Sequence, residues 1–200
     1  VHNSTCTLEK SLKKLGFNQT NKSYFDTLKI EVNADHIQTI AESKGVNFNY
    51  PNKKTATISL NETTSIADLN NIVSIFAELV DKPFEKILKI QEHNHILNAV
   101  KRTSKFLENE VFNTYHSETD LMRYIKSLER KDLSLNHSMI SLGSCTMKLN
   151  AAAEMLPLSW NNWGNIHPFA PLNQVEGYLS VLSKLEEQLT EITGFAGTSL

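Results

Sequence analysis

The sequence is poor in cysteine, glycine and proline, and each shortage excludes a class of protein. Of its 200 residues only two are cysteine, seven are glycine and five are proline. Two cysteines cannot build the disulfide framework of a small secreted domain, which favours a reducing compartment. Sparse glycine and proline exclude collagen-like and low-complexity chains. No apolar run reaches the ~18 residues that a membrane-spanning helix requires.

The chain also lacks a large excess of charge of either sign. Twenty Lys and Arg residues oppose 22 Asp and Glu residues, the formal charge is −2, and 40% of the residues are hydrophobic. This composition is typical of a globular protein. It argues against a nucleic-acid module, which needs a basic face. The start of the chain shows no basic-then-apolar signal segment, and we expect the chain to be a piece of a longer protein.

The first 80 residues predict a small domain in which helices alternate with strands. Leucines at helical spacing before Gly16 predict a first helix, with Ser4 or Thr5 as its cap. Alternating apolar and polar residues over 24–32 predict a half-buried strand. A second helix is expected over 34–44.

A hairpin and a third helix complete this predicted domain. The hairpin is expected to join 46–50 to 55–60 through a turn at 51–53. The third helix is expected to begin at Ser65, where Asp68 completes a capping box. Helices that cover one face of a short antiparallel or mixed sheet make an α+β lobe.

The rest of the chain shows a less regular pattern. Residues 83–113 are expected to form connecting helices, and Ser117 with Asp120 predicts a capping box that opens an amphipathic helix. Five of the seven glycines and both tryptophans fall in the last third of the chain, which predicts an irregular but ordered arm. A final helix is expected over 174–193, and its leucine stripe is typical of a core-facing helix rather than a coiled coil.

Two short polar motifs favour ordinary structural interpretations. His93 and His95 stand two residues apart, so they point away from each other on a helix, and no further ligand follows at metal-binding spacing. We therefore predict no metal site there. The basic residues of 101–105 lack interleaved aromatic residues, so we interpret them as a solvated face rather than a nucleic-acid site.

A run of hydroxyl, thiol and ammonium groups follows a glycine at 143, and it comprises Ser144, Cys145, Thr146 and Lys148. A glycine before small hydroxyl residues lets backbone and side-chain donors converge on an anion. The lysine would add positive charge for a carboxylate or phosphate. On composition alone, an ordinary polar turn is the alternative. Residues 165–171 form a second unusual cluster, in which His167 precedes a proline, and a rigid loop is the alternative there.

These two stretches together closely resemble the glycine cleavage system P-protein family. The resemblance rests on HSMISLGSCTMKLNA at 137–151, NIHPFAP at 165–171 and EITGF at 191–195, with support from VFNTYHSE at 111–118 and LERKDLS at 128–134. It is strong over 106–200 and weaker, mostly in pattern, before that.

The resemblance implies a fold and a division of the chain. Members of the family contain two related halves, each similar to a pyridoxal phosphate (PLP) enzyme of fold type I. By this resemblance, residues 1–85 form the small α+β lobe that ends the first half. Residues 86–131 form connecting helices. Residues 132–200 form the N-terminal arm and first long helix of the second half, which carries the cofactor.

The resemblance also implies an activity. The intact enzyme is expected to be an oxidoreductase, glycine dehydrogenase (decarboxylating), which decarboxylates glycine with PLP. It then passes the aminomethyl group to the lipoylated H-protein. The expected location is cytoplasmic if the source is bacterial, or mitochondrial if it is eukaryotic. The rest of the P-protein and a dimer partner are further expected partners, whereas nucleic acid and membrane are not.

The resemblance places the residues that anchor the cofactor outside this chain. The lysine that forms the Schiff base lies far beyond Leu200, and the loop that holds the cofactor phosphate begins just after it. We therefore expect the isolated chain to bind no PLP and to be inactive. The candidate lining of the substrate pocket comprises Ser144, Cys145, Thr146, Lys148 and His167. A non-catalytic structural or interaction domain is the alternative for the chain taken alone.

Overall fold

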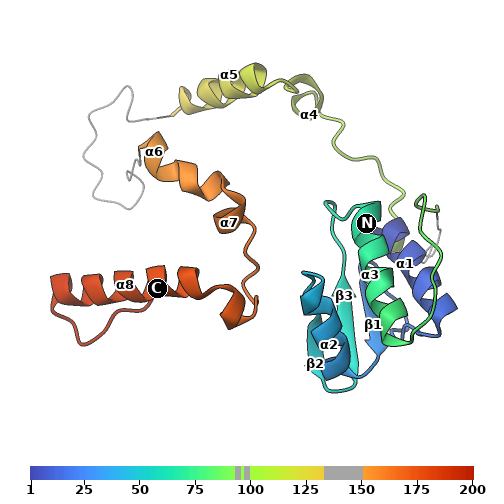
Figure 1. The fold of residues 1–200 in the computed structure, drawn as a ribbon. Helices are drawn as coiled ribbons and strands as arrows, with labels where there is room; N and C mark the ends of the chain where they lie inside the picture. Colours follow the sequence, from blue (N-terminus) through green and yellow to red (C-terminus); the bar gives the residue numbers. More distant parts are fainter. Residues whose placement is uncertain (93–95, 97–99, 133–150) are drawn as a thin grey trace. The chain divides into compact units, whose positions relative to one another are not determined.

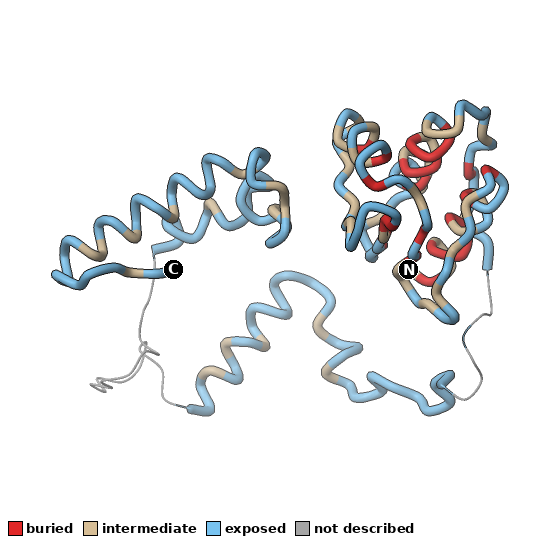
Figure 2. Tube along the Cα trace, turned by 90° about the horizontal axis from the view of Figure 1, so that it is seen from below, coloured by how far each residue is buried: buried red, intermediate tan, exposed pale blue. Residues whose placement is uncertain are grey.

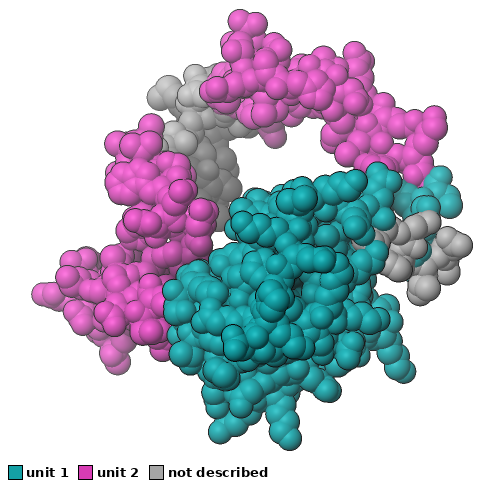
Figure 3. Space-filling view, turned by 45° about the vertical axis from the view of Figure 1, so that its right-hand side comes forward, with its two compact units in different colours: residues 1–103 teal, residues 104–200 magenta. Residues whose placement is uncertain are grey.

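The computed structural model describes residues 1–92, 96, 100–132 and 151–200. It divides into two compact units, unit 1 over residues 1–103 and unit 2 over residues 104–200 (Figure 3). The division of the chain into three parts that the resemblance implies stays a prediction.

Unit 1 is a three-stranded antiparallel sheet with helices packed beside it (Figure 1). The strand order is β1-β3-β2, so β3 is central. Helix α3 packs against both α1 and α2, and α1 also contacts β1. In chain order the elements are α1 (His2–Leu15), β1 (Thr27–Glu31), α2 (Ala34–Ser43), β2 (Asn49–Asn52), β3 (Thr55–Ser59) and α3 (Ile66–Leu79). The α+β interpretation of this region is confirmed.

The core of unit 1 forms because the strands alternate as predicted. Leu28 and Ile30 of β1 are fully buried, whereas Lys29 and Glu31 face solvent. The register pairs Leu28 with Ile58 and Ile30 with Ala56, so the apolar residues of both strands share one face. A period of two residues places alternate side chains on that face. Figure 2 shows buried residues in unit 1 only.

Two predicted helix boundaries of unit 1 are confirmed. Gly16 follows α1 in the left-handed conformation with φ 104°, which a glycine adopts without a side-chain clash. At the start of α3, Asp68 N–H donates to Ser65 Oγ at 3.2 Å, and Ser65 N–H donates to the Asp68 carboxylate at 2.8 Å. These two bonds form the expected capping box.

Two other predicted boundaries are wrong. Helix α1 begins at His2 after Val1 and has no side-chain cap, so Ser4 and Thr5 lie inside it. The β2–β3 turn falls at Lys53 and Lys54, because β2 continues through Pro51. A proline is tolerated there because β2 is an edge strand with a register shift, so its missing N–H breaks no ladder.

The connecting helices expected over 83–113 are only partly present among the described residues. Over the described residues of 83–110 there is no α-helix. Residues 83–91, here called the exit strap, lie along α1 and α3 instead, and their backbone bonds to side chains of those helices. The described helices of this region are α4 (Val111–Thr114) and α5 (Glu118–Glu129).

Among the described residues of unit 2 no side chain is buried, so the helices described there share no core. The arm contains α6 (Ala152–Met155), η3 (Leu156–Ser159), α7 (Asn161–Gly164) and η4 (Leu172–Gln174), followed by α8 (Glu176–Thr193). The expected final helix and its stop are confirmed, since Gly194 has φ 70°. The prediction that its stripe is buried is wrong within this chain, because Leu185 is 41% and Ile192 is 80% exposed.

The predicted cap of α5 is only half formed. Asp120 N–H donates to Ser117 Oγ at 3.1 Å, as expected. The Asp120 carboxylate accepts from the Ser117 hydroxyl at 2.7 Å rather than from the Ser117 backbone. Tyr115 and Tyr124 stack at a ring-centroid distance of 4.2 Å, which holds the residues before α5 against its first turns.

Candidate functional site

Of the five residues predicted to line the substrate pocket, the structure describes one. Ser144, Cys145, Thr146 and Lys148 lie outside the described residues, as do His93 and His95. The role assigned to each therefore stays a prediction. His167 is described, and its surroundings show what it offers chemically.

His167 stands exposed in a tight turn of the arm. Its Nδ1 atom accepts the Phe169 backbone N–H at 3.1 Å, and its carbonyl accepts the Ala170 N–H at 2.9 Å. Because Nδ1 accepts, the neutral ring carries its proton on Nε2. Proline at 168 fixes the backbone between the two bonding positions. The turn is thus a rigid loop that presents one imidazole N–H donor outward.

Close packing within the arm positions the segment just before this loop. A side chain at Gly164 would meet the Leu158 carbonyl oxygen at 2.9 Å, so α7 can approach η3 only because residue 164 is a glycine. The Trp163 and Tyr178 rings lie 5.3 Å apart, which links α7 to the first turn of α8. These contacts fix the position of α7, from which the loop of 165–171 begins.

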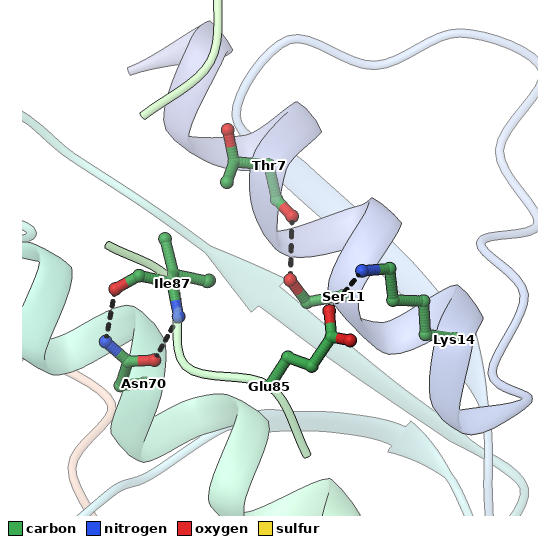
Figure 4. A network of polar contacts seen from close by, with 6 residues as sticks. All are labelled: Thr7, Ser11, Lys14, Asn70, Glu85 and Ile87. Carbon is green, nitrogen blue, oxygen red and sulfur yellow. Dashed lines mark hydrogen bonds and ion pairs between the residues drawn. The ribbon is translucent and has the colours of Figure 1, made fainter. Parts of the chain in front are cut away.

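A second candidate site is a groove in unit 1 between α1 and the exit strap. Asn70 of α3 holds the strap there through two bonds to one residue. Its Oδ1 accepts the Ile87 N–H at 2.8 Å, and its Nδ2 donates to the Ile87 carbonyl at 2.9 Å (Figure 4). Ile87 is buried, and the Gln91 N–H donates to Thr7 Oγ1 at 3.2 Å. The strap is therefore a fixed part of the lobe.

The groove beside the strap is rich in lysine. Lys10 and Lys14 line it from α1, Lys86 and Lys89 line it from the strap, and Glu85 is the single carboxylate among its lining residues. Glu85 pairs with Lys14 at 2.6 Å. This ion pair lowers the pKa of the Glu85 carboxyl below its ordinary value. Sequence analysis missed the groove because its two walls are some 70 residues apart in the chain and neither carries a motif.

A buried cluster of titratable groups also escaped sequence analysis. His2 Nδ1 bonds to the Phe25 carbonyl at 2.9 Å, and His2 Nε2 lies 3.5 Å from the Cys6 sulfur. Tyr24 donates to the Glu9 carboxylate at 2.7 Å. Cys6 is fully buried and His2 is 7% exposed. The spacing of four residues between His2 and Cys6 was the one available signal, since it places both on one helix face.

This cluster is stable rather than reactive. Burial, and next the hydrogen bond to Glu9, raise the pKa of the Tyr24 phenol far above its ordinary value, so the phenol keeps its proton. Each polar group has a partner, and the thiol has no exposed surface. The arrangement satisfies buried polar groups and ties α1 to the segment before β1.

The described parts of the chain show neither a metal centre nor a membrane span. Among residues 1–92, 96, 100–132 and 151–200, no three His, Cys, Asp or Glu side chains gather in a way that could hold a metal ion. None of the helices described there is long and apolar enough to span a bilayer.

Comparisons with known proteins identify relatives of the whole chain. A family model described as the glycine cleavage system P-protein matches residues 1–76. Glycine dehydrogenase (decarboxylating) from Christiangramia forsetii is 60% identical over all 200 residues, and the protein of that name from Flavobacterium johnsoniae is 56% identical over the same length. The Bacteroides thetaiotaomicron protein of that name is 52% identical.

In each of these comparisons the whole chain aligns, but it covers only 21–22% of the relative. The chain belongs to the glycine cleavage system P-protein family and spans about a fifth of the length of the curated relatives it matches. The resemblance drawn from the arm motifs is confirmed.

Proposed function

We propose that this chain is part of a glycine dehydrogenase (decarboxylating). In that enzyme it would supply one wall of the substrate pocket, and other residues would anchor the cofactor. The observation that supports this is identity of 52–60% along the entire chain to three proteins that carry this name. Identity that includes both units favours a role for the arm as well as for the lobe.

In this proposal the cofactor of the intact enzyme is pyridoxal phosphate. The described residues of this chain do not form a binding site for it. A phosphate or pyridine ring needs an enclosing set of polar groups. No described residue of unit 2 is buried, and His167 faces solvent. The cofactor would therefore be held by residues outside this chain, in a second half of fold type I.

The arm would act on the carboxylate of glycine. The exposed Nε2–H of His167 and the donors at Ser144 and Thr146 would orient that carboxylate, and Lys148 would add positive charge. Cys145 would lie in the same pocket wall. Fixing a substrate group in the reactive geometry accelerates its reaction without any covalent step by the arm. The rigid turn of residues 165–171 suits this role, because its donor direction is set before substrate binds.

The decisive experiment removes these donors one at a time from the full-length enzyme. Ser144→Ala, Thr146→Ala and His167→Ala are compared with His36→Ala, which removes an exposed imidazole from α2 of unit 1. The assay is glycine–bicarbonate exchange. We expect at least one arm variant to lose more than about threefold, roughly 0.7 kcal/mol, and the His36 variant to be unaffected. Exchange within that limit for all three arm variants would refute the pocket assignment.

The partners in this proposal are the remainder of the P-protein, a second copy of the enzyme and the lipoylated H-protein, in a cytoplasmic setting. Uncovered apolar side chains throughout unit 2 support the first of these. Leu158, Phe169 and Leu172 are each more than 60% exposed. Such surfaces are normally covered by another part of the protein.

A non-catalytic interaction segment is the second candidate for the chain alone, and the same exposed side chains favour it. Titration of the isolated chain with pyridoxal phosphate tests the premise that both candidates share, namely that the chain anchors no cofactor, whereas the exchange assay of the arm variants separates the two candidates. We expect no visible absorbance from a Schiff base. A stoichiometric absorbance band would mean that the chain itself anchors the cofactor and would contradict the division of roles proposed above.

A further inference from the structure

The lysine-rich groove of unit 1 concentrates positive charge on a protein whose overall charge is negative. Four lysines and one glutamate line it, which gives a formal charge of +3, whereas the whole chain carries −2. The glutamate already pairs with Lys14. A cleft lined by one sign of charge attracts partners of the opposite sign and speeds their association.

An apolar side chain stands among these ammonium groups. Leu88 is 85% exposed, the highest exposure of any large hydrophobic side chain in the described part of unit 1. Its neighbour Ile87 points inward and is buried, so the strap alternates between core and surface. Lys86 and Lys89 flank this pair in the chain. An apolar centre within a polar rim is the usual composition of a protein interface.

The strap carries these groups on a backbone that is already fixed. Both polar atoms of the Ile87 backbone bond to Asn70 (Figure 4). The Gln91 N–H donates to Thr7 Oγ1. A surface that is ordered before binding loses little conformational entropy when a partner docks. The Lys14–Glu85 ion pair adds a contact between strap and α1.

We propose that this groove docks a partner protein that presents carboxylates around an apolar hollow. On the function proposed above, on which this identification rests, that partner is the lipoylated H-protein. A single-stranded nucleic acid is disfavoured, because its sites use arginine and exposed aromatic rings for stacking. The groove contains no arginine, and its one aromatic residue, Phe84, packs against the core.

The test reverses the charge of the strap in the full-length enzyme. Lys86→Glu with Lys89→Glu is compared with Lys53→Glu plus Lys54→Glu, which makes the same charge change on the exposed β2–β3 turn. We expect the strap variant to raise the KM for H-protein about tenfold at low ionic strength, while the KM for glycine stays within about twofold. The turn variant should change neither constant beyond about twofold. Leu88→Ala should raise the KM for H-protein about threefold, with no dependence on salt.

Two results would overturn the docking proposal. One is a KM for H-protein that the strap variant leaves unchanged. The other is a lower melting temperature of the full-length strap variant together with a loss of kcat, since that would show the groove to be covered by the rest of the polypeptide. A wild-type enzyme without glycine decarboxylation would refute the proposed function instead. In that case calorimetric titration of wild type and strap variant with H-protein still decides the docking.

Discussion

Units 1 and 2 differ in whether their apolar side chains are buried. Every buried side chain among the described residues lies in unit 1. Of the 25 large hydrophobic side chains that are exposed, four lie in unit 1 and 21 in unit 2. Both units have well-formed helices, so helix formation alone does not distinguish them. Unit 1 therefore has its own core, whereas the helices described in unit 2 leave their apolar side chains exposed within this chain.

Amide exchange should separate the units most strongly. We expect amides of α3 and β3 to exchange about 1000-fold more slowly than those of α8, because opening the core of unit 1 costs several kcal/mol and α8 lacks a core. Hydrogen exchange followed by mass spectrometry of the whole chain measures this ratio. In the full-length enzyme α8 should gain protection. Equal protection of α3 and α8 in the 200-residue chain would remove the distinction between the units.

A large-to-small substitution sharpens the same comparison. Phe76 is fully buried and meets Phe17 edge-on at 4.9 Å, so Phe76→Ala should lower the free energy of unfolding by about 3–5 kcal/mol. Phe112→Ala is the matched change in unit 2, where the ring is 53% exposed, and it should cost less than about 0.5 kcal/mol. Urea denaturation of the chain followed by far-ultraviolet circular dichroism gives both values. A similar loss for both variants would indicate a core in unit 2.

The bonds that hold the strap should contribute less to the free energy of unfolding than the core does, but by a measurable amount. Asn70→Ala leaves the partly buried N–H and carbonyl of Ile87 without their partner, which should cost about 1–3 kcal/mol. Asn71→Ala, at the next position of α3, serves as the control and should cost less than about 1 kcal/mol. Urea midpoints measure the loss, and exchange of the amides of 83–91 localises it. Unchanged protection of the strap in Asn70→Ala would show that apolar packing alone holds it.

The smallest effect concerns pH. The backbone N–H and the hydroxyl of Ser65 lower the pKa of the Asp68 carboxyl below its ordinary value of 3.8. A depressed pKa in the folded state gives stability that is present above the unfolded value and is lost as the pH falls through the folded value. Because Asp68 is exposed and solvent screens its charge, Asp68→Asn should cost only about 0.5 kcal/mol or less at pH 7, and the difference should shrink below about pH 4. Denaturation at pH 7, 4 and 2.5 checks this. A difference that is constant across these pH values would contradict the assigned bonds.

What could be predicted from the sequence was whatever depends on near neighbours. Leu28 and Ile30 revealed their strand through a two-residue period, and Gly16 and Gly194 marked helix ends because few other residues adopt positive φ. Pro51 was predicted to lie in a turn, but it lies within β2. A strand accepts a proline there because β2 is at the edge of the sheet, and the order of the strands leaves no local signal in the sequence. The strap was missed for a similar reason, since the burial of Ile87 depends on Asn70, which lies 17 residues earlier.

The candidate sites also have features that local sequence predicts and features that depend on the fold. His167 drew attention through its proline neighbour, and the structure adds the tautomer that the Phe169 bond selects. The stripe of α8 was interpreted as a core face because its spacing is amphipathic, but spacing does not show what packs against it, and Ile192 is exposed in this chain. The lysines of the groove come from two distant segments, and only the fold brings them together.

Asn70 and Ile87 recognise each other much as two bases pair, with one donor and one acceptor on each side. An aspartate at position 70 would set a second acceptor against the carbonyl, and a leucine of equal size would offer neither group. Few other side chains at position 70 would therefore make both bonds to the Ile87 backbone. A change that removes this pairing would release the Ile87 backbone from α3 and loosen the segment that leads out of the lobe.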